Sequence, residues 1–297
     1  MKHWIQAARL RTLPLSVSGI IVGSAYAHYQ GYSDWRIVIL ALLTTLGLQI
    51  LSNYANDYGD GVKGTDANRI GEKRLVAAGV ITAEQMKKAV IITAILTFII
   101  ALLLIYVAFG KENFALSLIF ILLGIGSIGA AIKYTVGKSA YGYSGFGDVF
   151  VFIFFGLVSV IGSNFLFTHF IDWKLFLPAT AIGLLSVAVL NLNNMRDIEN
   201  DKIVGKNTLV VKIGLSWAKK YQHFLIVFPF VCLFIFSIGI DTRITLSYFV
   251  FIFFLKHLEK VRKATRYEDF DPELKKVALG TFVLSILFWL SLLFNNL

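Results

Sequence analysis

Long apolar runs separated by short polar connections dominate the sequence. Nine runs have about the 17 to 25 residues that cross the roughly 30 Å hydrocarbon core of a bilayer. They cover residues 12–29, 36–53, 89–109, 114–132, 147–169, 174–195, 221–240, 243–258 and 277–296. The pattern predicts an all-α polytopic membrane protein with nine transmembrane helices.

The composition agrees with these run lengths. Of the 297 residues, 57% are hydrophobic and only 15% are charged, which is too much apolar surface for a soluble globule to bury. The single cysteine, Cys232, allows no internal disulfide, and the five histidines lack the spacing of transition-metal ligands. Although Ala25-Tyr26-Ala27 ends the first run like a signal-peptidase site, the basic, proline-bearing start of that run favours a retained span.

Basic residues indicate the orientation of the spans. With the N-terminus in the cytoplasm, cytoplasmic segments hold 24 of the 28 Lys and Arg residues. The other four are Arg36, Lys111, Lys174 and Arg243. Lys and Arg concentrate in the cytoplasmic segments of membrane proteins, so we expect a cytoplasmic N-terminus and, after nine spans, an outside C-terminus. The net charge of +10 does not indicate nucleic-acid binding, because the basic residues follow the loops instead of forming one patch.

Acidic side chains gather at the ends of two predicted spans. One cluster, in residues 53–66, follows the second span, and another, in residues 193–201, closes the sixth. Ionised side chains at such positions are costly and need a reason, although solvation or pairing with Arg196 and Lys202 would suffice for either cluster alone. Both clusters repeat the order Asn, three residues, Asp and a further Asp. The repeat suggests that spans one to four and five to eight are related halves of one membrane-embedded domain, residues 1–297.

Helical spacing places each cluster on one face. The residues that share a face are Asn53, Asp57 and Asp60 in the first cluster and Asn193, Asp197 and Asp201 in the second. Such oxygen ligands suit Mg²⁺, which usually binds through one or two protein carboxylates plus substrate phosphate oxygens. We therefore expect Asp57, Asp60, Asp197 and Asp201 to hold metal ions that a diphosphate bridges. Gly59, Gly61 and Gly64 would let the chain leave the helix and bend Asp66 back toward the same place.

These motifs resemble the two aspartate-rich motifs of the UbiA superfamily of intramembrane aromatic prenyltransferases. Asn56-Asp57-x-x-Asp60 matches the start of the first motif and Asp197-x-x-x-Asp201 matches the second. The last acid of the first motif usually stands four residues after Asp60, where this chain has Gly64, and the next acid is Asp66. The resemblance covers nearly the whole chain. It is greatest to the 1,4-dihydroxy-2-naphthoate polyprenyltransferases of menaquinone synthesis, through residues 56–66, Arg11-Thr12-Leu13-Pro14 and Gly145-Phe146-Gly147-Asp148.

The resemblance implies a UbiA-type bundle in the inner membrane of a bacterial cell, with its active site facing the cytoplasm. It implies Mg²⁺-dependent transfer of a polyprenyl group from polyprenyl diphosphate to 1,4-dihydroxy-2-naphthoate, with release of diphosphate and CO₂, giving demethylmenaquinone. The alternative acceptors are 4-hydroxybenzoate, homogentisate and haem. An alternative of another class is a secondary transporter, whose acidic residues tend to lie nearer the bilayer midplane. The Asp-Gly-x-x-Ala-Arg signature of phosphatidyltransferases is absent.

Further residues complete the expected site. Tyr134 and Lys138 match the spacing of a Tyr/Lys pair in the superfamily and are expected to be catalytic. By position and charge, Arg69, Lys73 or Arg74 would close over the diphosphate or bind the aromatic carboxylate. Tyrosines near the site would stabilise an allylic cation. The basic residues expected at phosphate oxygens are Lys133, Lys138, Arg11 and Arg196, although membrane topology alone also explains them. The expected substrate-binding set also includes Asn53, Asn56, Asp66, Arg74, Tyr143 and Asn193.

Overall fold

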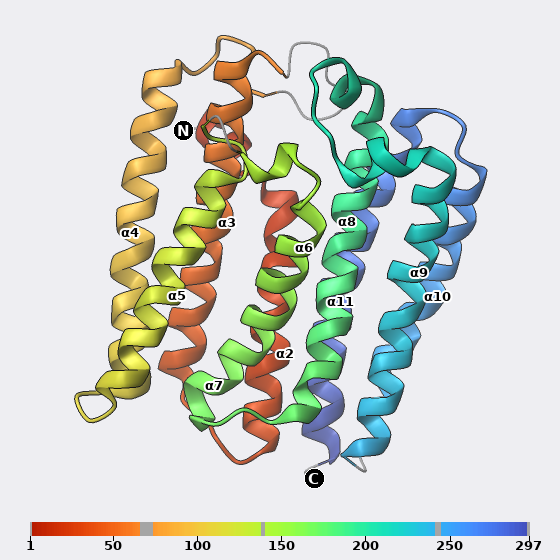
Figure 1. Cartoon of the computed structure of the whole chain (residues 1–297). Coiled ribbons are helices and arrows are strands. Elements are labelled where there is room, and N and C mark those ends of the chain that lie inside the picture. The colour runs from red at the N-terminus through yellow and green to blue at the C-terminus, as the bar shows by residue number, and fades with distance from the viewer. Residues whose placement is uncertain (1, 66–73, 138–139, 241–244, 296–297) are drawn as a thin grey trace. The chain divides into compact units, whose positions relative to one another are not determined.

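The computed structural model of the chain describes residues 2–65, 74–137, 140–240 and 245–295, and these residues form helices and connections without any strand (Figure 1). The prediction of an all-α fold is confirmed. In chain order the elements are α1 (Lys2–Ala8), η1 (Leu10–Thr12), α2 (Leu13–Tyr29), α3 (Trp35–Lys63), α4 (Ala83–Phe109), α5 (Phe114–Lys133), η2 (Tyr141–Tyr143), α6 (Gly147–Val151), the π-helix η3 (Phe152–Ile161), α7 (Gly162–Thr168), η4 (Trp173–Leu175), α8 (Phe176–Ile203), α9 (Leu209–Gly239), α10 (Thr245–Lys263), η5 (Tyr267–Asp269) and α11 (Phe270–Asn295).

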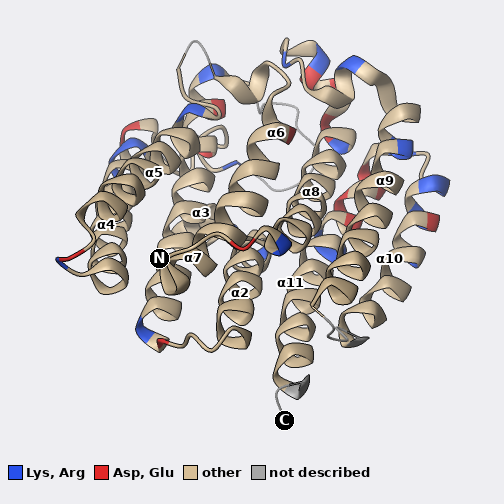
Figure 2. Ribbon diagram, turned by 60° about the horizontal axis from the view of Figure 1, so that its bottom comes forward, with Lys and Arg blue, Asp and Glu red and all other residues tan. Residues whose placement is uncertain are grey.

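Seven helical segments in the described part of the chain are long and apolar enough to cross a membrane, so the chain is a multi-pass membrane protein. They are Trp35–Lys63, Ala83–Phe109, Phe114–Lys133, Gly147–Thr168, Trp173–Arg196, Leu209–Gly239 and Tyr267–Leu293. The other two expected runs coincide with α2, which has 17 residues, and with α10, whose last turn is basic. The count of nine spans therefore stays a prediction. Charged segments gather in the connections and at the helix ends (Figure 2).

Several helices extend beyond the apolar runs that predicted them. Helix α3 continues to Lys63 instead of ending at residue 53, and α8 continues to Ile203 instead of ending at residue 195. A hydropathy pattern stops at the first polar residues, whereas a helical backbone continues through them when their side chains find partners. As a consequence, Asp57 and Asp60 lie on α3, and Asp197, Glu199 and Asp201 lie on α8.

Two compact units divide the chain. The first consists of Met1–Leu13, Trp35–Gly147 and Glu199–Thr208, and the second of Pro14–Asp34, Asp148–Ile198 and Leu209–Leu297. This division differs from the expected halves of spans one to four and five to eight. The related halves and the single domain stay predictions.

Helix α3 is the centre of the first unit. It packs against α1, α4 and α5, and its Leu51 and Ala55 are fully buried. A capping box starts α4, in which the Thr82 hydroxyl accepts from the Gln85 amide at 3.2 Å and the Gln85 side chain accepts from the Thr82 amide at 3.0 Å. Helix α5 has no buried residue. The first motif is thus carried by the helix against which three other helices of the unit pack.

Helix α8 has the corresponding place in the second unit. Within its membrane-length window 72% of the residues are buried, in a core shared with α2, η3, α9, α10 and α11. A buried polar chain also crosses this core. Asn191 of α8 donates to Gln222 of α9 at 2.8 Å, the Gln222 amide lies 3.1 Å from His257 of α10, and His257 lies 2.8 Å from Glu273 of α11. This chain of contacts links α8, which carries the second motif, to α9 and through α9 to α10 and α11.

Candidate active site

The first motif forms one buried face of α3. Asn53, Asp57 and Asp60 are 3%, 1% and 3% exposed, as expected for residues that a helix places in one column. All three side chains have hydrogen-bond partners in the structure. The Asn53 amide donates to the Ala8 carbonyl at 2.8 Å and to the Thr12 hydroxyl at 3.2 Å, so it holds the N-terminal segment, including η1 with Arg11, on α3.

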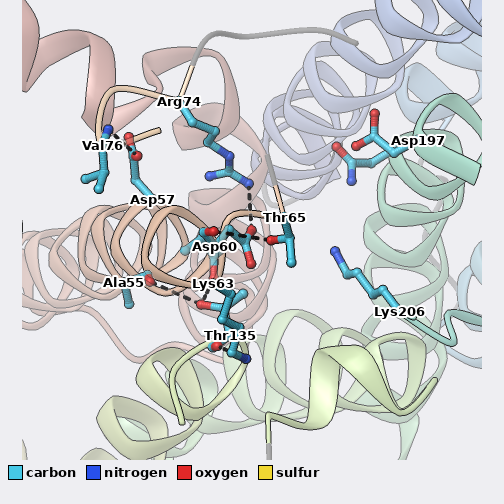
Figure 3. A network of polar contacts seen from close by, with 12 residues as sticks. Ala55, Asp57, Asp60, Lys63, Thr65, Arg74, Val76, Thr135, Asp197 and Lys206 are labelled. Atoms are coloured by element: carbon cyan, nitrogen blue, oxygen red, sulfur yellow. Dashed lines mark hydrogen bonds and ion pairs between the residues drawn. The ribbon is translucent and has the colours of Figure 1, made fainter. Parts of the chain in front are cut away.

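Asp57 organises the connection that precedes α4. One of its carboxylate oxygens accepts from the Val76 amide at 3.0 Å (Figure 3). The other accepts from the Leu75 amide at 3.1 Å. Val80 and Ile81 then donate back to the Leu75 carbonyl, which closes a compact turn. The Asp57 carboxylate therefore holds the backbone of the segment that directly follows Arg74.

Asp60 is the centre of a polar cluster in the first unit. Its Oδ2 pairs with Arg74 Nη2 at 3.4 Å (Figure 3). Its Oδ1 accepts from the Tyr143 hydroxyl at 2.8 Å. Arg74 is only 7% exposed, so the pair is shielded from water and its interaction is stronger than that of a surface pair. Three expected site residues, Asp60, Arg74 and Tyr143, are thus in direct contact.

The end of the second motif lies in the same unit. The Asn200 amide donates to the Thr65 carbonyl at 2.9 Å, and the Thr65 hydroxyl lies 3.0 Å from that of Tyr143. Asp201, which is 3% exposed, pairs with Lys206 at 3.8 Å. The unit therefore gathers carboxylates from both motifs, together with polar groups that connect them.

Two lysines of this cluster were not among the predicted site residues. Lys63 Nζ donates to the Thr135 carbonyl at 2.7 Å and lies 4.0 Å from the centre of the Tyr143 ring, and Lys206 Nζ lies 5.4 Å from the same ring. Lys63 follows Asp60 by three residues, so helical spacing was a signal for its position. Lys206 follows Gly205, whose φ of 72° reverses the chain after α8 and brings the lysine back toward Asp201.

The prediction for the glycines of the first motif was wrong for two of three. Helix α3 runs through Gly59 and Gly61, and only Gly64, with a φ of 71°, ends it. A Cβ on Gly59 would lie 2.8 Å from the Thr135 hydroxyl and 3.0 Å from the Thr135 backbone. Gly59 therefore allows the 135 segment to approach α3, where the Thr135 hydroxyl donates to the Ala55 carbonyl and the Asn56 side chain.

The second unit holds the rest of the second motif. The Arg196 guanidinium, 1% exposed, donates from Nε and Nη2 to the two oxygens of Asp197 at 2.8 and 2.9 Å. It also donates to Asn193 Oδ1 at 2.7 Å and to Asp271 of α11. Arg196 was expected at a phosphate oxygen, but here four of its hydrogen bonds go to protein side chains.

The remaining predicted residues fall outside these contacts. Lys133 is exposed at the end of α5, and the Tyr134 ring packs edge-on against Tyr141 with ring centres 5.3 Å apart. The Tyr141 hydroxyl donates to the Ala130 carbonyl at 2.9 Å, and burial raises the pKa of this phenol above its ordinary value, which keeps it a neutral donor. Asp66 and Lys138 lie outside the described residues, as do Arg69 and Lys73.

The donors of the first unit fit a hard divalent cation. Asp57, Asp60 and Asp201 are buried carboxylates, and oxygen is the ligand type that Mg²⁺ prefers. Among the residues that the structure describes, no three His, Cys, Asp or Glu side chains converge on one point. One or two carboxylates per ion, completed by substrate phosphate oxygens, is the usual arrangement for Mg²⁺, so the residues fit a metal that binds together with its substrate.

Sequence comparison gives close relatives over most of the chain. A "1,4-dihydroxy-2-naphthoate octaprenyltransferase" from Haemophilus influenzae is 40% identical over 301 aligned residues, which cover 99% of this chain and 96% of the relative. The protein of the same name from Escherichia coli (strain K12) is 50% identical over 236 residues, covering 79% of this chain and 76% of the relative.

Solved structures share the fold. A UbiA homolog from Aeropyrum pernix K1, in its apo form, superposes with a TM-score of 0.72 at 14% identity, covering 97% of this chain and 99% of that one. A UbiA homolog from Archaeoglobus fulgidus, bound to GPP and Mg²⁺, gives a TM-score of 0.67 at 14% identity, with coverage of 96% and 98%. The sequence profile of the UbiA prenyltransferase family matches residues 16–292. With both aspartate motifs on the helices expected for them, this chain belongs to the UbiA prenyltransferase family.

Proposed function

We propose that the chain transfers a polyprenyl group from polyprenyl diphosphate to 1,4-dihydroxy-2-naphthoate. The observation that carries the proposal is the 40% identity to the Haemophilus influenzae octaprenyltransferase over 99% of this chain. In the reaction the allylic carbon–oxygen bond breaks and a bond forms to the ring. Diphosphate and CO₂ leave, and the ring product is the reduced form of demethylmenaquinone.

Asp57, Asp60, Asp197 and Asp201 are the residues that we propose as Mg²⁺ ligands. The support is the motif spacing, the burial of all four carboxylates and the Archaeoglobus fulgidus homolog bound to Mg²⁺. When bound, the metal supplies positive charge to the diphosphate oxygens as the leaving group develops negative charge.

The chain's own cations and donors have a related role in the proposal. Lys63, Arg74 and Lys206 surround Asp60 and Asp201, and we assign them to binding of the diphosphate. The Tyr143 hydroxyl, which donates to Asp60, holds that carboxylate in one orientation, while its ring lies 4.0 Å from Lys63 Nζ. Asp66, Lys133, Tyr134, Lys138, Arg11, Asn56 and Asn193 stay proposed members of the site.

The proposed setting is the inner membrane of a bacterial cell. Nine spans in a single domain, with the N-terminus in the cytoplasm and the C-terminus outside, place all but four basic residues on the cytoplasmic side. In this orientation the diphosphate site faces the cytoplasm. The isoprenoid tail occupies the membrane.

The deciding experiment is a transfer assay with the purified protein in lipid nanodiscs. Octaprenyl diphosphate is offered with dihydroxynaphthoate, 4-hydroxybenzoate or homogentisate, with Mg²⁺ or with chelator, and products are identified by mass spectrometry. Magnesium-dependent product from dihydroxynaphthoate alone is expected. Product from another acceptor would move the chain to another pathway, and no product from any acceptor would contradict the proposal.

Substitution variants test the proposed ligands in the same assay. Asp60→Ala and Asp197→Ala are expected to lose transfer while keeping the helical circular-dichroism signal. Asp269→Asn removes a half-buried acid that pairs with Arg266 at 3.0 Å; this variant is the matched control and is expected to keep wild-type activity. Full activity in both alanine variants would remove these acids from the metal site.

A further inference from the structure

Helix α9 bends near its start and has a groove beside the bend. Gly214 has a φ of 77° and a ψ of 164°, outside the helical region, and it separates residues 209–213 from residues 215–239. Glycine alone adopts such a backbone conformation without strain. The groove has a volume of about 370 Å³, and its lining residues are Leu209, Ile213, Trp217, Lys220 and Tyr221. Both parts of the helix contribute to this list, so the bend shapes a concave surface within the second unit.

The walls of the groove are apolar and aromatic, and an aromatic stripe continues them along α9. Trp217 is 62% exposed. The Tyr221 ring stacks with Phe224, with ring centres 6.5 Å apart, and Phe224 stacks with the exposed Phe228 at 5.2 Å. Residues three and four apart share one face of a helix, and this helix is long and apolar enough to cross a membrane. The groove and the stripe therefore offer one continuous apolar surface to the hydrocarbon chains of the bilayer.

Lys220 gives this apolar groove a positive charge. Its Nζ lies 4.2 Å from the centre of the Trp217 ring, a cation–π contact that holds the ammonium beside the groove. In the described part of the chain, no carboxylate forms an ion pair with Lys220. Asp148 of α6 acts electrostatically on the Tyr221 phenol, but it is only 9% exposed. Residues 202–240 contain five lysines and no Asp or Glu, so the surroundings of the groove favour an anion.

We propose that this groove binds an anionic phospholipid. One acyl chain lies in the groove and along the aromatic stripe, and the Lys220 ammonium donates to phosphate oxygens of the head group. A zwitterionic phospholipid has the same chains, but the cation of its own head group opposes Lys220, so charge complementarity selects the anionic lipid. Trp217 and Tyr221 are the residue types that favour the level of the head groups. None of the proposed metal ligands or diphosphate-binding residues lines the groove, so the inference goes beyond the proposed function.

The test measures lipid selectivity at Trp217 in nanodiscs. The other four tryptophans, Trp4, Trp35, Trp173 and Trp289, are replaced by Phe. Fluorescence of Trp217 is then quenched by brominated phosphatidylglycerol in plain phosphatidylcholine, or by brominated phosphatidylcholine in plain phosphatidylglycerol. The two titrations give the association constant of the anionic lipid relative to the zwitterionic one. A ratio of about five is expected, the factor that one lysine adds for an anionic lipid. A ratio of one would overturn the proposal.

Three lysine variants separate a defined site from general attraction to anionic lipid. Lys220→Gln is expected to lower the ratio to about one, and Lys220→Arg, which keeps the charge, to leave it within about twofold. The matched control is Lys256→Gln, which removes the same charge from an exposed lysine on α10 of the same unit and is expected to leave the ratio unchanged. Both lysines are exposed, so neither substitution disturbs the core. An equal loss in Lys220→Gln and Lys256→Gln would overturn the proposal.

Farnesyl diphosphate distinguishes the phospholipid from a prenyl diphosphate, because both combine an apolar chain with phosphate oxygens. Added in excess with Mg²⁺, it is expected to leave the quenching by brominated phosphatidylglycerol unchanged. Loss of that quenching would overturn the proposal and assign the groove to the prenyl diphosphate. A dimer in light scattering together with a ratio of one would assign it to a second copy of the chain. The measurement needs no turnover, so failure of the proposed reaction would not decide it.

Discussion

Asp57 and Asp60 lie three residues apart on one face of α3, but their carboxylates have different partners. Asp57 accepts two backbone N–H groups of the connection before α4, whereas Asp60 contacts the side chains of Arg74 and Tyr143. Backbone donors are fixed in place, while side chains can rearrange around a bound ion. A motif of identical acids thus combines a support for the backbone with a more adaptable carboxylate.

Asp57→Asn is expected to loosen this connection even without metal. An amide has one acceptor oxygen, and its NH₂ group would face a backbone N–H, so one of the two hydrogen bonds is lost. Loss of a hydrogen bond to a charged group costs about 1.5–3 kcal/mol, so amide exchange at Leu75 or Val76 should accelerate at least about tenfold. Hydrogen–deuterium exchange of the metal-free protein measures the exchange rates of these two amides. Asp60→Asn is the control and is expected to leave exchange at these two amides unchanged. If Asp57→Asn exchanges no faster than Asp60→Asn at Leu75 and Val76, Asp57 does not support this connection.

Tyr143→Phe separates the hydroxyl from the ring. The variant loses the donor to Asp60 but keeps the ring face beside Lys63. We expect kcat/KM to fall about tenfold, which corresponds to one hydrogen bond to a charged group. Tyr141→Phe, whose hydroxyl contacts the Ala130 carbonyl instead, is the matched control and should stay within about twofold of wild type. A similar loss in both would indicate a general packing effect.

At the scale of the helix, apolar runs predicted where elements lie but not where they end. Run lengths depend on transfer of side chains into hydrocarbon, which the sequence reports directly. The last turns of α3 and α8 instead depend on partners from distant segments, such as the amides of Leu75 and Val76 for Asp57. No spacing within residues 53–66 reports those partners.

The same limit holds for the site: the sequence predicted which residues share a helix face, but not the contacts that distant segments make with them. Helical spacing within one motif placed Asp57 and Asp60 on one face. Position and charge indicated Arg74, and the need to stabilise an allylic cation indicated Tyr143. The contact between Thr65 and Asn200 joins residues that are 135 positions apart, and it depends on how the chain folds back. Lys206 was missed for this reason, because its approach to Asp201 requires the turn at Gly205.

Gly59→Ala tests the close approach of α3 and the 135 segment. The new methyl group would lie 2.8 Å from the Thr135 hydroxyl and 3.0 Å from its backbone, so the two segments must separate. Overpacking of this kind costs about 1–3 kcal/mol, and we expect a lower Tm in detergent. Gly126→Ala on α5, where a Cβ meets no atom within 4 Å, is expected to keep or slightly raise the Tm, since alanine favours helix over glycine. An unchanged Tm in Gly59→Ala would refute tight packing there.

At the scale of the whole molecule, the proposed orientation in the membrane rests on the distribution of basic residues, and a labelling experiment tests it. In a Cys232→Ala background, single cysteines replace Lys111, between α4 and α5, or Thr265, after α10, and both positions are exposed. A membrane-impermeant maleimide is expected to label Lys111→Cys in intact spheroplasts and Thr265→Cys only after permeabilisation. The reverse pattern would invert the proposed topology and put the diphosphate site outside.

Helix α5 has no buried residue, although it packs along α3 and α4, and its glycines at 124, 126 and 129 face open space. A side chain there has to suit fluid hydrocarbon, not a partner of fixed shape. Many apolar residues meet that demand equally well. Homologous chains are therefore expected to drift in sequence along α5 while keeping its hydrophobicity, and to hold the side chains of α3 and α8 nearly constant. This helix is accordingly the most suitable place in the first unit for an inserted probe or crosslinker.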